Sequence, residues 1–146
     1  MTAPRLSTIG YERKTVDEFL AQLAEAGVRL VIDVRAVAAS RRPGFSKTAL
    51  AAGLREHGID YLQLRDLGTP KAGRDAARRG RTAEMRGIYG LHLETPEAEL
   101  AMEQALAAAG NRPAALLCYE AEAECCHRAM VAERLVGRGG FAVTNH

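Results

Sequence analysis

The chain has 146 residues and a mass of 15.7 kDa, the size of a single domain with one hydrophobic core. Apolar residues make up 47% of it and charged residues 26%, a balance that excludes an intrinsically disordered chain. The longest apolar runs are only a few residues, far short of the ~20 that cross a bilayer. We therefore expect residues 1–146 to form one domain without a membrane span.

The net charge of +2 is unevenly distributed. Residues 1–91 carry sixteen basic and ten acidic side chains, whereas residues 92–146 carry four and eight. A charged partner is therefore expected to meet the first part of the chain. Three cysteines, two of them adjacent, do not form the disulfide framework of a secreted domain, and the N-terminus lacks a secretory signal. We expect a cytoplasmic protein with free thiols.

The first elements follow clear local patterns. Residues 5–10 predict a strand, and the T-x-x-E sequence of residues 15–18 predicts the capped start of a helix that ends at Gly27. Residues 28–34 form a nearly continuous β-branched run, which is typical of a central parallel strand buried on both faces. A basic loop over residues 36–45 then precedes a helix capped by Ser46 that reaches about His57.

The remaining pattern alternates in the same way. It predicts a strand, a helix, a strand, a helix and a strand over residues 59–64, 95–110, 114–119, 125–136 and 141–144. Between the first two, residues 65–86 carry seven basic and three acidic side chains, and we expect this stretch to be exposed and mobile. The alternation predicts an α/β fold, an open and mainly parallel sheet with helices on both faces in a Rossmann-like three-layer arrangement.

In such sheets ligands bind beyond the carboxyl ends of the strands. Three predicted strands end in polar or nucleophilic groups, and the start of the last helix returns toward the same rim. The candidate catalytic residues at this rim are Cys118, Asp33, His127 and Cys126, and the candidate substrate-binding residues are Gly10, Tyr11, Arg35, Arg41 and Arg128.

Several of these residues belong to a recognisable set of motifs. In chain order the set comprises Thr8–Tyr11 with the following helix start, Asp33–Arg35, Ser40–Ser46, Tyr61–Gly68, and Cys118 with Cys126–Arg128. With this set the chain resembles the bacterial and archaeal family called the domain of unknown function 488. The resemblance supplies candidate residues without an established reaction. The chain departs from the pattern in an extra cysteine, Cys125, and in three glutamates between the motif cysteines.

Cys118 has two interpretations. As a nucleophile it would need positive surroundings, which Arg35, Arg41 and Arg128 would supply while also holding an anionic substrate. As a small buried residue at a strand end it would only pack. The anion-wrapping loops of cysteine phosphatases and rhodaneses carry an arginine about six residues on, where this chain has Glu124. That difference argues against their chemistry.

Other arrangements of the same residues stay open. Cys118, Cys126 and His127, with Asp33, would make a poorly spaced zinc site, and Cys118 with Cys126 would make a redox pair. We expect neither a bound metal nor a cofactor. Asp33 and Arg35 lie on one face of their strand, which allows a structural ion pair. Alternatively, Asp33 faces Arg128 or His127 and fixes their orientation, or it stands alone in the cleft as a candidate base.

Two functions are therefore carried forward. The first is a small cytoplasmic enzyme that acts on an anionic ligand, phosphorylated or nucleotide-like, through the Cys/His/Arg/Asp site. The second is a non-catalytic module that binds nucleic acid or protein through its arginines. Its basic stretch comprises Lys71, Arg74, Arg78, Arg79, Arg81 and Arg86.

Overall fold

The computed structural model describes residues 4–119 and 127–146. Its centre is a five-stranded sheet in the order β3-β2-β4-β1-β5, in which every pair of neighbours is parallel. The strands are β1 (Arg5–Gly10), β2 (Leu30–Asp33), β3 (Asp60–Gln63), β4 (Ala114–Cys118) and β5 (Ala142–Asn145). Each of them lies where the sequence predicts a strand, and the prediction of a parallel sheet is confirmed.

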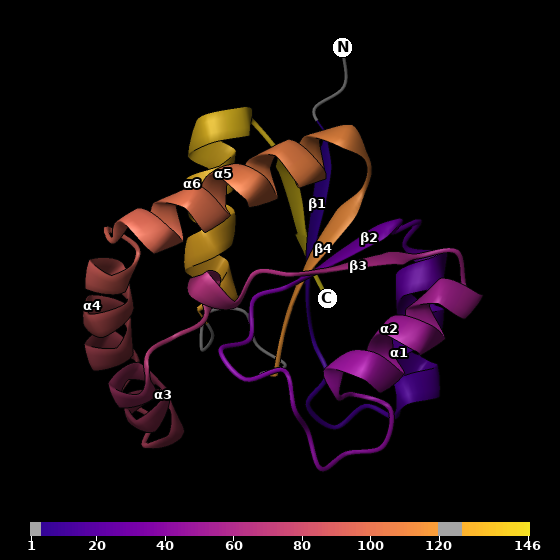
Figure 1. The fold of residues 1–146 in the computed structure, drawn as a ribbon, viewed down its shortest axis with the longest axis horizontal. Coiled ribbons are helices and arrows are strands. Elements are labelled where there is room, and N and C mark those ends of the chain that lie inside the picture. The colour runs from indigo at the N-terminus through magenta and orange to yellow at the C-terminus, as the bar shows by residue number, and fades with distance from the viewer. Residues whose placement is uncertain (1–3, 120–126) are drawn as a thin grey trace.

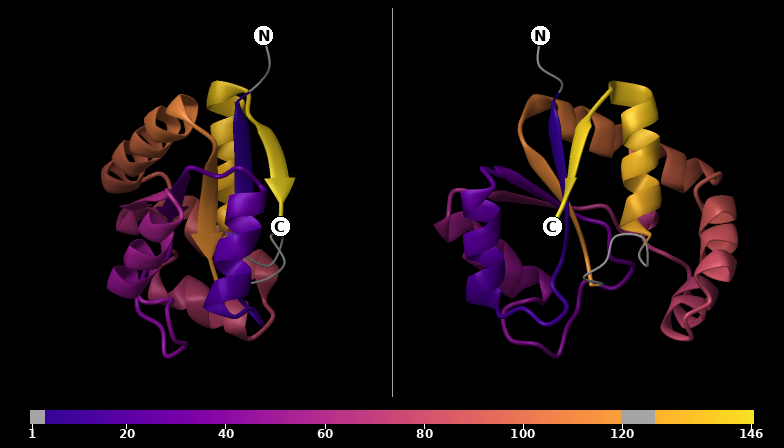
Figure 2. Two further views of the ribbon diagram at one scale, coloured as in Figure 1. Left: turned by 90° about the vertical axis from the view of Figure 1, so that its right-hand side faces the viewer. Right: turned by 180° about the vertical axis from the view of Figure 1, so that it is seen from behind.

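Helices cover both faces of this sheet (Figure 1). One face carries α1 (Val16–Glu25) and α2 (Lys47–Glu56). The other carries α5 (Pro96–Asn111) and α6 (Arg128–Gly139). Seen from behind, α1 and α6 lie on opposite sides of the strands (Figure 2, right). The predicted three-layer α/β architecture is therefore confirmed.

The first helix shows how local sequence fixes an element. The Thr15 side chain accepts a hydrogen bond from the Glu18 backbone N–H, and the Glu18 carboxylate accepts one from the Thr15 N–H, at 3.1 and 3.0 Å. Gly27 has a φ of +75°, the left-handed conformation that ends the helix at little cost for glycine. The predicted capping box and glycine stop are both present.

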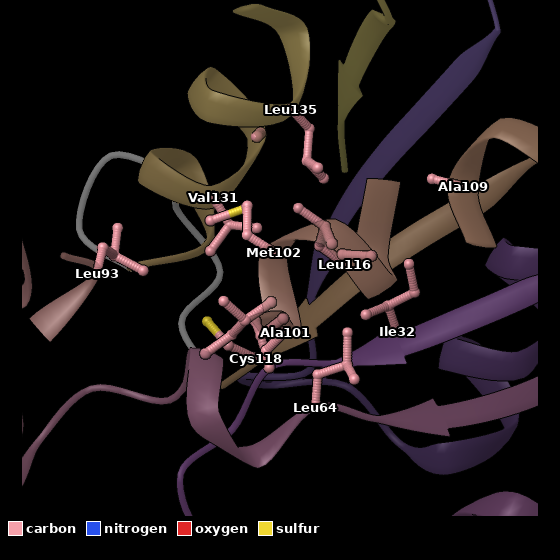
Figure 3. Close-up of a cluster of buried hydrophobic side chains, with 14 of the residues drawn as sticks. Ile32, Leu64, Leu93, Ala101, Met102, Ala109, Leu116, Cys118, Val131 and Leu135 are labelled. Carbon is pink, nitrogen blue, oxygen red and sulfur yellow. The ribbon is translucent and has the colours of Figure 1, made fainter. Parts of the chain in front are cut away.

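Alternating side chains of the central strands divide the core into two clusters. On β2, Val31 faces α1 and α2 while Ile32 faces α5 and α6, and all four residues of the strand are buried. On β4, Leu117 faces the first layer while Leu116 and Cys118 face the second. Figure 3 shows Cys118 inside this second cluster, near side chains of α5 and the end of β3. Because successive side chains of a strand alternate between the two faces of the sheet, the position of a residue along its strand decides which helical layer its side chain meets.

The stretch over residues 65–86 differs from its prediction. It folds into a 3₁₀ turn, η1 (Arg65–Leu67), and two helices, α3 (Lys71–Arg78) and α4 (Thr82–His92), which pack mainly on each other at one end of the molecule (Figure 1). The buried positions of α3 are the small residues Gly73 and Ala76, so this helix shows no stripe of large apolar residues in its sequence. The Tyr89 hydroxyl donates a hydrogen bond to the Leu67 carbonyl and so anchors α4.

The last helix and strand agree with the prediction within a few residues. Residues 125 and 126, where the predicted helix begins, lie outside the described residues, and α6 extends to Gly139 rather than Val136. Gly140 follows with a φ of +67°. Within the described ranges, none of the helices combines the length and the apolar character that crossing a membrane requires.

Candidate functional site

The chain connections leave β1 and β4 in opposite directions. From β1 the chain crosses through α1 to β2, and from β4 it crosses through α6 to β5 on the far side of β1. Neighbouring strands whose connections diverge in this way leave a crevice at their carboxyl ends. A cavity of about 260 Å³ occupies that position. Among the described residues it is lined by Tyr11, Arg35, Ala36, Val37, Thr69, Arg74, Ala77, Arg78, Met85, Cys118, Tyr119 and His127.

Asp33 and Arg35 form a buried ion pair, one of the alternatives that the sequence left open. The Arg35 Nη2 donates to Asp33 Oδ2 at 2.7 Å and Nε donates to Oδ1 at 2.9 Å. The same carboxylate accepts the Arg35 backbone N–H at 3.0 Å and the Tyr61 hydroxyl. The Asp33 side chain is fully buried, so its oxygens are engaged within the fold rather than presented to the cavity.

Arg35 connects this pair to the cavity wall. Its Nη1 donates to the Phe45 carbonyl at 2.7 Å and to the Tyr11 hydroxyl at 3.4 Å. Burial opposes the charge on Arg35, but the hydrogen bonds and charge of Asp33 outweigh it, so the pKa of Arg35 is raised above its usual value. Arg35 is therefore a permanent cation whose charge is mostly balanced by Asp33.

Cys118 ends β4 with its side chain against the cavity. It is buried at 1% exposure, and Arg128 Nη1 lies 3.4 Å from its sulfur. Arg128 is itself fully buried at the start of α6. Cys118 is disulfide-bonded in the structure, so the expectation that all three cysteines are free thiols is wrong for this state. The sulfur thus lies between a buried guanidinium and the cavity.

His127, the residue before α6, closes the same side of the cavity. Its Nε2 lies 2.6 Å from the Val34 carbonyl, and its ring meets the Tyr89 ring edge to face at 5.2 Å. Burial lowers the pKa of His127 to about 4, against a weaker opposing effect of the Val34 hydrogen bond. Because a carbonyl only accepts, the neutral imidazole carries its proton on Nε2.

Two arginines of α3 line the cavity, although the sequence placed them only in the basic stretch. Arg74 is partly buried, donates from Nη1 to the Thr69 carbonyl at 2.8 Å, and has no ion-pair partner among the described residues. Arg78 is more exposed and pairs with Asp75 at 3.3 Å. Arg74, Ala77 and Arg78 share one helix face by their three- and four-residue spacing. Recognition of α3 as a helix would have identified this face.

Two other predicted site residues, Gly10 and Arg41, do not line the cavity. Gly10 ends β1 opposite Cys118 in the sheet register but does not line the cavity, and Arg41 is exposed on the loop after β2, also outside the lining. Its neighbour Arg42 instead donates to the carbonyls of Tyr11 and Lys14. Cys126 lies outside the described residues.

The zinc alternative finds no support in the geometry of the described residues. The Asp33 carboxylate already forms an ion pair with Arg35. Its position on β2 also directs the Asp33 side chain to the face of the sheet opposite that of Cys118. Within residues 4–119 and 127–146, no three histidine, cysteine or carboxylate side chains gather closely enough to hold a metal ion. Cys118 and His127 remain the pair of candidate catalytic groups that the cavity brings together.

Comparison with known proteins gives a family but no neighbour of established activity. A search of curated proteins and a search of solved structures each returned no match. The family model for the domain of unknown function DUF488 matches residues 15–135, which include β2, β4, the whole of α3 and α4, and every residue lining the cavity except Tyr11. The chain therefore belongs to the DUF488 family.

Proposed function

We propose that this protein is a small enzyme that binds an anionic substrate, phosphorylated or nucleotide-like, in the cavity at the carboxyl ends of β1, β2 and β4. The observation that carries the proposal is the charge of the cavity wall. Arg35, Arg74 and Arg78 line it, and no carboxylate does so among the described residues. An anion would therefore meet positive charge in a partly enclosed site, where screening by water is reduced.

Arg74 is the side chain best placed to hold the anion. Arg35 is balanced by Asp33, and Arg78 shares its charge with Asp75. Arg74 is held to the Thr69 carbonyl through Nη1, which leaves other donors of its planar guanidinium for a ligand. A preordered guanidinium loses little side-chain entropy when it binds, which favours a role for Arg74 in recognition.

Cys118 would supply the chemistry in its reduced form. A thiolate is the reactive state of cysteine, and a guanidinium at 3.4 Å from the sulfur stabilises that negative charge. His127 lies on the same wall and, because burial lowers its pKa to about 4, adds no charge to the site at physiological pH. The proposal places the active form in the reducing cytoplasm, where thiol reductants such as glutathione would supply the two electrons that open the Cys118 disulfide.

The alternative, a module that binds nucleic acid through the basic stretch, has less support from the side-chain contacts. Three of its arginines form ion pairs, Arg78 with Asp75, Arg81 with Glu84, and Arg86 with Glu133. Strong nucleic-acid binding would show as an affinity that falls steeply with salt.

Calorimetric titration with ribose 5-phosphate tests the anion site. The wild type is expected to bind, and Arg74→Ala to bind at least about tenfold more weakly, because one charge-assisted hydrogen bond is worth about 1.5 kcal/mol or more. The matched control is Arg79→Ala, an exposed arginine next to the end of α3 that does not line the cavity, and it should bind as the wild type does. Equal binding by all three proteins, or no binding by the wild type, would overturn the proposal.

Alkylation tests the role of Cys118. After reduction, the folded protein is treated with iodoacetamide at neutral pH and the modified cysteines are identified by peptide mass spectrometry. We expect Cys118 to be modified and ribose 5-phosphate to slow its modification, because the sulfur lines the proposed site. A Cys118 that stays unmodified until the protein is unfolded would be a packing residue only.

A further inference from the structure

Two large apolar side chains that are exposed to solvent lie in the wall of the cavity. Among the described residues the large exposed apolar side chains are Val37, Leu91, Leu100, Tyr119, Val136 and Val143. Two of them, Val37 at 58% and Tyr119 at 45% exposure, line the same cavity as Arg74. Isolated apolar residues on a surface need no explanation, but two at the wall of one charged cavity form a local apolar surface beside a cation.

Tyr119 is held in place from both its backbone and its ring. The Glu12 backbone N–H donates to the Tyr119 carbonyl at 2.9 Å. The Tyr119 ring stands nearly perpendicular to the Tyr11 ring, at 82° and 5.3 Å between centroids. Tyr11 is in turn stacked on Phe45 at 4.4 Å. A ring that is fixed in this way and still 45% exposed is a preorganised surface for a flat ligand.

Other apolar residues contribute to the wall as well. Ala77 and Met85, from α3 and α4, line the cavity together with Val37, while Arg74 brings the cation. A ligand that fits such a wall carries both an anionic group and a flat group that packs on an aromatic ring. The volume of about 260 Å³ lies just below the usual range for small-molecule sites, about 300–1,000 Å³, so the site is too small for a dinucleotide.

We infer that the substrate is a mononucleotide, with its phosphate at Arg74 and its base against Tyr119 and Val37. The inference rests on the proposed anion site and adds to it a class of ligand and a specificity-determining residue, Tyr119. Stacking on an aromatic ring is available to every base, because each has a π face. Tyr119 would therefore distinguish nucleotides from sugar phosphates rather than one base from another.

The test compares AMP with ribose 5-phosphate, which carries the same phosphorylated ribose without the base. Dissociation constants for both are measured by calorimetry on the wild type, Tyr119→Ala and Tyr119→Phe, with unfolding curves to confirm that each variant folds. The control is Leu91→Ala, which removes another exposed apolar side chain, from α4, outside the cavity. We expect AMP to bind at least about fivefold more tightly than ribose 5-phosphate to three of the proteins, namely the wild type, Tyr119→Phe and Leu91→Ala. That factor corresponds to the lower limit of the free energy of base stacking on an aromatic ring. Tyr119→Ala should lose that preference and bind ribose 5-phosphate as the wild type does.

The possible results separate the two proposals. If AMP and ribose 5-phosphate bind the wild type equally, or if Tyr119→Ala keeps the preference for AMP, the nucleotide inference is wrong while the anion site stands. If neither compound binds the wild type, the anion site fails and the inference fails with it. If Tyr119→Phe loses the preference as well, the hydroxyl rather than the ring recognises the ligand, which also contradicts stacking.

Discussion

Replacement of His127 by glutamine should change how the stability of the protein depends on pH. In the folded protein burial lowers the pKa of His127 to about 4, whereas in the unfolded chain it is about 6.5. Between these values the unfolded chain binds a proton that the folded protein does not, so the free energy of unfolding falls as the pH falls. Above about pH 6.5 both states are neutral, and the stabilisation is complete there.

The size of the effect follows from the two pKa values. A difference of about 2.5 units corresponds to about 3.4 kcal/mol once the pH is below 4, and about 2 kcal/mol of it is lost between pH 7.5 and pH 5. Glutamine keeps an N–H that can donate to the Val34 carbonyl but does not titrate. The difference in stability between wild type and His127→Gln should therefore shift by about 2 kcal/mol in favour of the variant over this range.

Urea unfolding curves at several pH values between 7.5 and 5 provide the measurement. Carboxylates titrate in the same range, but they are common to both proteins and cancel in the difference. His57→Gln, at an exposed histidine at the C-terminal end of α2, is measured beside it as the control for exchanging a histidine for glutamine. If the curves of wild type and His127→Gln run parallel, His127 is not held neutral by burial and its place beside Cys118 is wrong.

Two further substitutions test the packing that frames the cavity. A Cβ at Gly68 would lie 2.3 Å from the Ala36 Cα, so Gly68→Ala should force the two loops apart and destabilise the protein by roughly 1–3 kcal/mol in urea unfolding. The control Gly87→Ala, on an exposed position of α4 with open space around it, should stabilise the protein by roughly 0.5–1 kcal/mol. A Gly68→Ala variant as stable as the wild type would contradict the close approach of Gly68 to Ala36. Asp33→Asn should cost roughly 3–5 kcal/mol, because it leaves the Arg35 charge buried without its counter-ion, and a loss below about 1 kcal/mol would show that the pair is solvated.

The framework of the sheet could be predicted because it depends on strong local signals. The β-branched run before Asp33 predicts a strand buried on both faces, and β2 is buried at every position. The Thr15–Glu18 capping box and the left-handed Gly27 set the ends of α1 without help from the rest of the fold. Such elements encode their boundaries in a few neighbouring residues.

The residues around the cavity were harder to predict because they depend on packing between distant segments. Helix α3 buries glycine and alanine rather than large apolar residues, so its pattern does not show which face Arg74 occupies. Arg41 and Arg42 are adjacent in the sequence, but Arg42 donates hydrogen bonds to backbone carbonyls of the β1–α1 loop while Arg41 is exposed. The choice of ion pair or free base for Asp33 also required coordinates, because strand parity brings Arg35 to the same face in either case.

The central claim is that an anion binds at the carboxyl ends of β1, β2 and β4, beside Arg74. Titration of ¹⁵N-labelled, reduced protein with ribose 5-phosphate, followed by NMR, tests it most directly because it needs no substitution. The account predicts saturable shifts of the Val37, Thr69 and Arg74 amides, all from the cavity wall, with the amides of Val143 and Thr144 on the far strand β5 unmoved. Shifts confined to surfaces away from the cavity, or no saturable shift at all, would contradict it.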